Sequence, residues 1–305
     1  MKSSKKFWHV FSSGYLRIIG IALFVWIVMS IDRRQLVLIV RDANKYLLTL
    51  ALFMQLLVYT AKALRWHAMV CATNMKPTFG NSWHLYNIGV FLATITPAKL
   101  GEFGKVVYLK KKGLPATVGI ALVIVDRLAD VIVISLLGIV GIGILFGKIW
   151  SLIAIALVLF VCLIALFVWK IIGNERKSLF KTVIVPLLPK KKTVIIVLLY
   201  TILSWILYFG WAVQIAHSVE MNVPIPILIS AFTITGILSL LPIAPAGLGT
   251  RDAALLVLLA AYGVSGSQAV ALALLMFCSI LVMGIPGGFC WLLEDGRKKG
   301  STMQS

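Results

Sequence analysis

The chain has 305 residues, of which 61% are hydrophobic and 13% are charged, with a formal net charge of +19 and a mean hydropathy of +1.02. This balance excludes a soluble globular domain and predicts an all-α polytopic membrane protein. The Lys and Arg residues stand in short segments between apolar stretches, where they set topology and meet anionic lipid. Because no basic domain exists, we expect no nucleic-acid partner.

Membrane spans begin near the N-terminus. Residues 15–31 form an apolar stretch that predicts the first span. Residues 32–46 mix charges with apolar side chains, which indicates a short interfacial helix. Residues 47–64 predict a second span, and Arg65 and Trp66 at its end are expected to anchor it at the membrane interface.

The segment Thr96–Lys105 (TPAKLGEFGK) interrupts the next apolar region. Pro97 should break a helix that arrives from 82–95, and Gly101 lets the chain reverse. The arm of 82–95 reaches only ~21 Å, which is less than the ~30 Å hydrocarbon core, and the arm of 101–109 is shorter still. Two short arms around a break predict a re-entrant hairpin.

The remainder of the chain repeats these elements. We expect further membrane spans at 115–147, 149–169, 193–217 and 267–293. A basic loop is expected at 170–192, and a second broken segment at 224–262. Near position 245 the second break repeats part of the first one: Pro97, Ala98, Leu100 and Gly101 match Pro245, Ala246, Leu248 and Gly249.

An odd number of spans between the two hairpins makes the repeat inverted. The fold prediction is therefore a single domain, 1–305, with six full spans and two re-entrant hairpins in an inverted repeat. An eight-span count, in which every arm crosses, stays open. The excess of Lys and Arg places the basic tails, 1–13 and 294–305, in the cytoplasm.

Charges inside the predicted spans mark the candidate site. Asp126 and Asp130 share a helix face, and Arg127 is three residues before Asp130, close enough to pair with it. Each such charge costs ~2.5–3.5 kcal/mol at the centre of a span, so the three should face the protein interior. They form either a purely structural ion network or a polar site. The candidate substrate-binding residues are Lys99, Glu102, Asp126, Arg127, Asp130, Arg251 and Asp252.

Other polar groups near the two breaks could also belong to the site. Helix N-termini at Gly101 and Gly249 would offer an anion site. Lys105 either joins the site or extends to the interface. Four threonines either bind a ligand or hydrogen-bond to their own helices: Thr94, Thr96, Thr233 and Thr235.

Cysteines and histidines show no metal-ligand spacing, and no catalytic motif or nucleotide loop is found. We therefore expect no metal, no cofactor and no enzymatic activity. Each of the four cysteines is expected to be a buried structural thiol.

Three ordered motifs together resemble one family: Thr96–Lys105, the run DRLAD at Asp126–Asp130, and the run PIAPAGLGTRD at Pro242–Asp252. This is the lysylphosphatidylglycerol synthase transmembrane-region family, which includes the membrane domain of multiple peptide resistance factor. The resemblance covers roughly residues 10–295. It implies the movement of aminoacylated phospholipids or lipid-linked sugars between leaflets. Since the sequence carries no soluble synthase domain, it implies a stand-alone flippase-like protein.

Two functions therefore stay open. The first is a cell-membrane flippase for a phospholipid or lipid-linked headgroup, in which the cluster of mixed charge sign holds a zwitterionic or phosphate-bearing headgroup. The alternative is an integral-membrane enzyme or accessory subunit of lipid or cell-envelope synthesis, with Glu102, Asp126 or Asp130 as acid or base. Expected partners are membrane lipids, a separate synthase or glycosyltransferase, and a second copy in a homo-oligomer.

Overall fold

The computed structural model of the chain describes residues 29, 32–73, 75–171, 191–239 and 249–302. The described residues form helices, turns and connecting segments, with no strand among them. The predicted first span, most of the basic loop and the second break from Pro242 to Leu248 lie outside the described residues. The prediction of an all-helical fold is confirmed.

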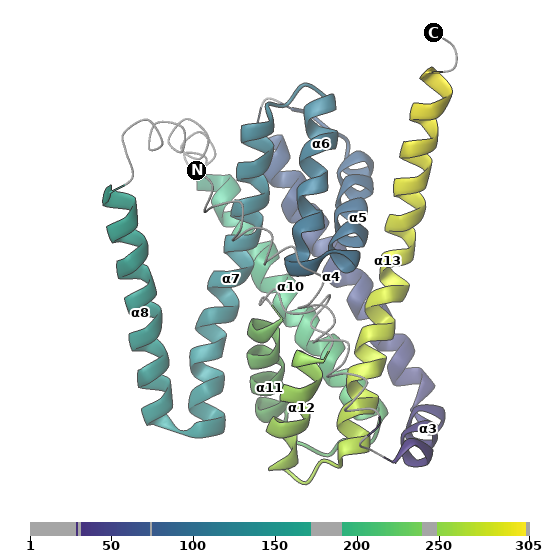
Figure 1. Ribbon diagram of the computed structural model, residues 1–305, viewed down its shortest axis with the longest axis vertical. Helices are drawn as coiled ribbons and strands as arrows, with labels where there is room; N and C mark the ends of the chain where they lie inside the picture. Colours follow the sequence, from purple (N-terminus) through teal and green to yellow (C-terminus); the bar gives the residue numbers. More distant parts are fainter. Residues whose placement is uncertain (1–28, 30–31, 74, 172–190, 240–248, 303–305) are drawn as a thin grey trace, which may run out of the picture.

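Four helices in the described part are long and apolar enough to cross a membrane. They are α4 (Lys45–Cys71), α7 (Ala116–Phe146), α10 (Lys191–Ser218) and the first 27 residues of α13 (Gly266–Thr302). A helix of that length reaches ~40 Å, more than the ~30 Å hydrocarbon core. The apolar helix α8 (Lys148–Ile171) stands beside α7 (Figure 1). The chain is therefore a polytopic membrane protein.

Shorter helices occupy the two halves of the molecule. Helix α5 (Phe79–Ile95), the 3-10 helix η1 (Pro97–Phe103) and α6 (Gly104–Lys111) lie in the upper half of Figure 1. Helices α11 (Ile225–Leu238) and α12 (Thr250–Ala260) lie in the lower half. The turn from α5 into η1 follows from Pro97, because the residue before a proline avoids the helical region and Thr96 is extended at φ −111° and ψ 145°.

Helix α3 (Arg33–Asp42) precedes α4 and packs against α13 through the buried side chain of Leu36. The carboxylate of Asp32 caps its first turn by accepting hydrogen bonds from the N–H groups of Arg34 and Gln35 at 2.9 and 3.2 Å. The short helix expected over 32–46 is therefore present. It ends at Asp42, and Asn44 caps the start of α4 two residues later.

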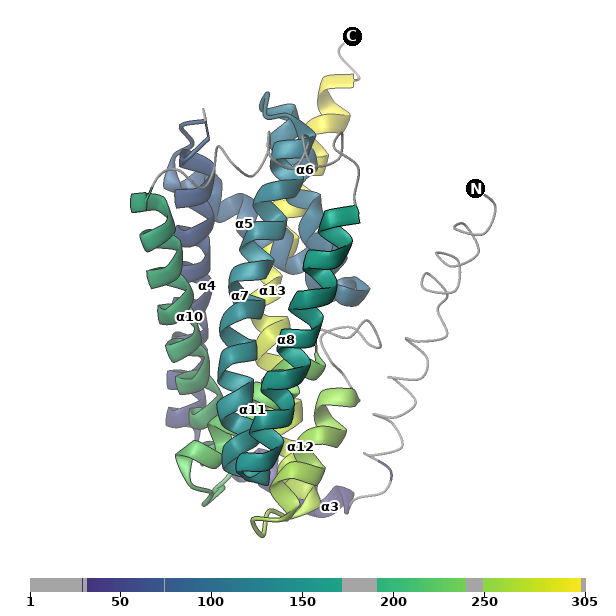
Figure 2. The same ribbon diagram turned by 90° about the vertical axis from the view of Figure 1, so that its left-hand side faces the viewer.

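Close packing joins the helices into one bundle, in which α4 and α10 run side by side (Figures 1 and 2). One buried apolar cluster centres on α10, α11 and α13, and a second centres on α4, α5, α6 and α7. At Gly101 a Cβ atom would clash with the carbonyl group of Leu92, so η1 approaches α5 closely because this residue has no side chain. A Cβ atom at Gly287 in α13 would clash with the carbonyl oxygen of Asn87 in the same way.

Two sequence-based expectations about side chains are wrong. Cys71, Cys162 and Cys278 are exposed on the surface and Cys290 is half-buried, so they are not buried structural thiols. Trp66 is fully buried and therefore does not anchor α4 at an interface. Both errors have the same cause, because the distance of a residue from the end of a span does not reveal which helix face packs against protein.

Candidate functional site

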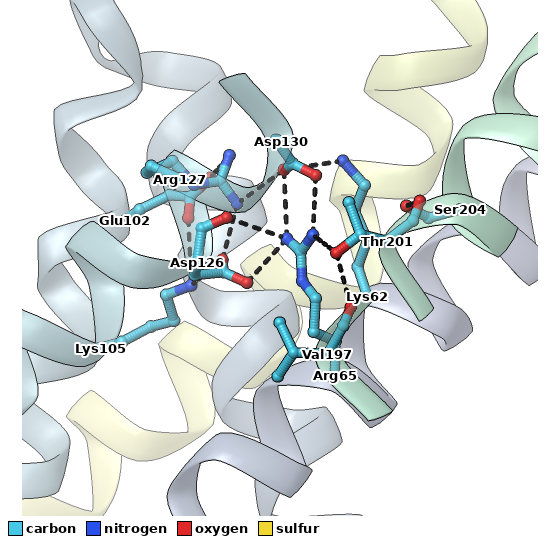
Figure 3. A network of polar contacts seen from close by, with 10 residues as sticks. All are labelled: Lys62, Arg65, Glu102, Lys105, Asp126, Arg127, Asp130, Val197, Thr201 and Ser204. Atoms are coloured by element: carbon cyan, nitrogen blue, oxygen red, sulfur yellow. Dashed lines mark hydrogen bonds and ion pairs between the residues drawn. The ribbon is translucent and has the colours of Figure 1, made fainter. Parts of the chain in front are cut away.

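Helix α7 supplies the centre of the site. Its long apolar sequence carries Asp126 and Asp130 one turn apart, and both are buried, with 0% and 8% of their surface exposed. An unpaired buried carboxylate is strongly unfavourable, so each of them requires cations from neighbouring helices. As expected from their i, i+4 spacing, both point into the bundle (Figure 3).

Arg65 on α4 provides the main counter-charge. Its guanidinium group forms a fork on Asp130, with Nη1 2.8 Å from Oδ1 and Nη2 3.1 Å from Oδ2. Nη2 also lies 2.7 Å from Oδ1 of Asp126, and Nη1 donates to Oγ1 of Thr201 on α10 at 3.0 Å. Arg65 is completely buried, so its predicted role as an interface anchor is wrong.

Lys62, one turn before Arg65 on α4, is the second cation that the sequence-based site missed. Its Nζ lies 3.2 Å from Oδ2 of Asp130 and 5.7 Å from the ring centre of Trp205. The i, i+3 spacing of Lys62 and Arg65 is the signal that would have found them. Two cations on one face of a long apolar helix face the protein interior for the same energetic reason as the charges of α7.

The first break adds Glu102 and Lys105, one on η1 and one on α6. Nζ of Lys105 lies 3.1 Å from Oε2 of Glu102 and 3.8 Å from Oδ2 of Asp126. It also lies 4.1 Å from the ring centre of Trp66 and 5.2 Å from that of Tyr86, as in cation–π contacts. Lys105 is fully buried and does not extend to the interface.

Arg127 connects α7 to the break. Its Nη1 lies 2.9 Å from Oε1 of Glu102, and its Nη2 lies 2.8 Å from Oδ2 of Asp126 and 3.6 Å from Oδ2 of Asp130. The expected pair with Asp130 is thus the longest of the three. About a quarter of the side chain stays exposed, at 28%, and Arg127 lines a cavity.

Two cavities adjoin this ion network. The first, of about 170 Å³, lies between α4, α5, η1, α7, α10 and α13. The second, of about 140 Å³, is lined by α4, η1, α7, α10, α11, α12 and α13. They share six lining residues, three of which are cations and the rest apolar or aromatic: Lys62, Lys99, Arg127, Tyr208, Trp211 and Ile280. Groups from both broken segments therefore line the second cavity.

Lys99 differs from the other cations of the site. It is exposed and lines both cavities, and it forms no ion pair with any residue that the structure describes. Its backbone has φ +55°, which is uncommon for a residue with a side chain. Glycine would adopt this conformation more easily.

Arg251 and Asp252 on α12 form a separate pair. Nε and Nη2 of Arg251 lie 3.1 and 3.0 Å from Oδ1 of Asp252, and Nη2 donates to the carbonyl oxygen of Ala273 on α13 at 3.1 Å. Arg251 lines the second cavity together with Asp130, and no ion pair joins them in the described part of the chain. Five of the seven predicted site residues thus line one or both cavities, namely Lys99, Glu102, Arg127, Asp130 and Arg251, whereas Asp126 and Asp252 are buried behind them as ion-pair partners.

The glycine N–H groups that were expected to bind an anion already have protein partners. The N–H of Gly249 donates to Oδ2 of Asp252 at 2.9 Å, and the N–H of Gly101 donates to Oγ1 of Thr96 at 2.7 Å. The first helix after the break also begins at Gly104 and not at Gly101. All four threonines back-bond to carbonyl groups in their own helices: Thr94, Thr96, Thr233 and Thr235.

The sum of charges around the cavities is positive. Five cations and three carboxylates gather on α4, η1, α6 and α7, which leaves two positive charges in excess when all are ionised: Lys62, Arg65, Lys99, Lys105, Arg127, Glu102, Asp126 and Asp130. Such an arrangement can hold an anion in a site from which much water is excluded.

Comparison with known protein families identifies the chain. Residues 16–288 match the model of the lysylphosphatidylglycerol synthase TM region. Curated proteins give no match to the chain.

Proposed function

The chain belongs to the lysylphosphatidylglycerol synthase TM region family, and from this premise we propose that it translocates a lipid between membrane leaflets. The headgroup binds in the two cavities beside Lys99 and Arg127, and the acyl or prenyl tails remain in the bilayer. The observation that carries the proposal is Lys99. It is a cation at a cavity wall with no counter-ion among the described residues, in a network that already has excess positive charge.

The size of the cavities supports a headgroup as the ligand. Sites for drug-sized molecules have volumes of ~300–1,000 Å³, and the two adjoining cavities, of about 170 and 140 Å³, together reach only the lower end of that range. They suit a headgroup and exclude a whole lipid.

The arrangement of the two broken segments supports transport. We propose that α5–η1–α6 and α11–α12 are re-entrant hairpins that enter from opposite faces, as an inverted repeat would place them. Their lengths, their positions in opposite halves of Figure 1 and their contributions to the second cavity all support this proposal. A headgroup bound there would meet both hairpins at once.

The carboxylates are poorly suited to the alternative function, in which one of them acts as acid or base. Glu102 contacts Lys105 and Arg127, and both aspartates of α7 contact three cations each. Glu102 and Asp130 line the cavities, but their ion pairs favour the charged carboxylates and stabilise the helix arrangement. Transport therefore fits their geometry better than acid–base chemistry.

The basic helix ends give an orientation. Lys111 at the end of α6, Lys191 at the start of α10 and the end of α13 all lie at the upper end of Figure 1. We propose that this end is cytoplasmic, because Lys and Arg accumulate on that side of membrane proteins.

Lys99→Ala tests the function directly. Purified protein is reconstituted into liposomes that contain a phospholipid with a fluorescent acyl chain, and a membrane-impermeant quencher reports its movement from the inner to the outer leaflet. We expect protein-dependent translocation that Lys99→Ala slows by about tenfold, the worth of one charge-assisted hydrogen bond of ~1.5 kcal/mol. Lys99→Arg should retain most of the rate.

Lys76→Ala is the matched control, because Lys76 is also exposed and lies outside both cavities. It removes the same charge and should leave the rate unchanged. Equal rates for folded Lys99→Ala and the unaltered protein would reject Lys99 as a headgroup ligand. A lack of protein-dependent translocation of any lipid would reject the function itself.

A further inference from the structure

Every carboxylate at the cavities is already matched with cations. Glu102 faces Lys105 at 3.1 Å and Arg127 at 2.9 Å. Asp130 faces Lys62 at 3.2 Å and Arg65 at 2.8 Å, and Asp126 is fully buried behind them. No acidic group on the described cavity walls is therefore left to receive a positively charged ligand.

An ammonium group in this space would meet cations on several sides. Lys62, Lys99 and Arg127 line both cavities, and Arg251 lines the second. Like charges repel strongly where water is largely excluded, so an amine-bearing headgroup is disfavoured at the point where a phosphate is favoured. The tyrosines and tryptophans of the walls could attract a cation, but the excess of positive charge around the cavities opposes this attraction.

The cavity walls also carry neutral polar atoms without partners. Gln55 on α4 and Trp211 on α10 line the first cavity, and Oε1 of Gln55 and Nε1 of Trp211 have no hydrogen-bond partner among the described residues. Their side chains are only 4% and 2% exposed, so bulk water does not satisfy them. Nε1 of Trp205 is in the same state on the wall of the second cavity. One acceptor and two donors, all uncharged, match hydroxyl groups, which both donate and accept.

We propose that the headgroup is an anionic phosphate ester whose remaining part is uncharged and carries hydroxyl groups. The phosphate lies by Lys99 and Arg127, and the hydroxyl groups reach Gln55 and the two tryptophans. This inference rests on the proposed translocation function and narrows its substrate. It excludes the aminoacylated and zwitterionic headgroups that the mixed charge signs of the sequence left open. A phosphoglycerol headgroup and a lipid-linked sugar phosphate share the required chemistry.

Four fluorescent lipids compared in the same liposome assay test the inference. Phosphatidylglycerol and a polyprenyl-linked hexose phosphate are anionic and hydroxylated, phosphatidylmethanol is anionic without hydroxyl groups, and aminoacylated phosphatidylglycerol carries an amine. We expect one of the first two to cross fastest, which also identifies the source of the headgroup. It should exceed phosphatidylmethanol by about threefold to tenfold, the contribution of one or two neutral hydrogen bonds. The aminoacylated lipid should be slowest.

Two variants tie this preference to the cavity. Trp211→Phe keeps the ring and removes the N–H donor, and Gln55→Met removes the acceptor at similar volume. Each should lower the rate of the hydroxylated lipid toward that of phosphatidylmethanol, whose own rate should not change. Trp150→Phe is the control, because Trp150 is 57% exposed and lies on α8, a helix that lines neither cavity.

The outcomes separate the inference from the function on which it rests. Equal rates for all four lipids, or fastest movement of the aminoacylated lipid, would overturn the inference while leaving translocation established. An unchanged ratio between hydroxylated lipid and phosphatidylmethanol in both variants, when folded, would also overturn it. No protein-dependent movement of any of the four lipids would overturn the proposed function.

Discussion

Replacing Arg65 with methionine tests whether the buried network holds the bundle together. Arg65 joins three helices, because it contacts Asp126 and Asp130 on α7 and Thr201 on α10 from its place on α4. Methionine has a similar length and suits the apolar surroundings, so the change removes the charge without leaving a large cavity. The experiment therefore isolates the electrostatic role of the residue.

The expected loss of unfolding free energy depends on the ion pairs that the two aspartates of α7 keep after Arg65 is replaced. Removing one partner of a buried ion pair costs ~3–5 kcal/mol, because the other charge stays buried without compensation. After the change, Asp126 keeps Arg127 at 2.8 Å and Asp130 keeps Lys62 at 3.2 Å. Thr201 keeps its own hydrogen bond to Val197, whereas Oδ1 and the carbonyl oxygen of Asp126 lose their contacts with Arg65. Because both aspartates keep a cation, we expect the lower end of the range, about 3 kcal/mol, which is a large part of a typical unfolding free energy of ~5–15 kcal/mol.

Reversible unfolding by SDS in mixed micelles, followed by circular dichroism, measures this loss. Combining Arg65→Met with Asp130→Asn should cost less than the two single changes added together, by ~0.5–3 kcal/mol, because the second change removes one of the two carboxylates that Arg65 balances. Arg41→Met is the control, since Arg41 forms an exposed pair with its neighbour Asp42 and should leave the transition unchanged. An unshifted transition in Arg65→Met, or strict additivity in the double variant, would refute the reasoning.

Three further predictions concern the first break and the orientation. Gly101→Ala should lower stability by ~1–3 kcal/mol in the same unfolding assay, because its Cβ would meet the backbone of α5, whereas Gly284→Ala, with no atom within 4 Å, should not destabilise the protein. Lys99→Gly should raise the unfolding free energy, since it relieves the positive φ, and still slow lipid translocation; a stability loss together with normal transport would contradict both roles of this lysine. In a cysteine-free background, an impermeant thiol reagent applied to intact cells should label a cysteine at Lys148 and not one at Lys191, and the reverse pattern would invert the proposed orientation.

Helix positions could be predicted well from the sequence. The apolar stretches 47–64, 115–147 and 193–217 correspond to α4, α7 and α10, and Pro97 marks the start of η1. These features depend on local rules: the length of an apolar run, the geometry before proline and the cost of a charge in a span. The burial of Asp126 and Asp130 followed from that cost alone.

The partners of those charges could not be predicted in the same way. Arg65 was assigned to the interface because it ends an apolar window, but α4 continues to Cys71 and places the guanidinium group between two carboxylates of α7. Lys105 is followed by other basic residues in the sequence, but its ammonium group lies over the buried rings of Trp66 and Tyr86 in cation–π contacts. The choice between a buried pair and an extended side chain depends on which helix lies opposite, and only the tertiary structure contains that information.

An all-helical membrane protein, with charges turned inward at a broken helix, can be inferred from the amino-acid sequence alone, because hydrophobic length and the cost of buried charge act locally. Which of these charges form ion pairs with one another, and which remain unpaired at a cavity wall, depends on the packing of the helices. Lys99, Arg127 and Arg251 are all cations near breaks, yet Arg251 is held by Asp252 and Ala273 and Lys99 is held by none of the described residues. The pair with Asp252 joins sequence neighbours, whereas the hydrogen bond to Ala273 depends on the packing of α12 against α13, which brings distant segments of the chain together.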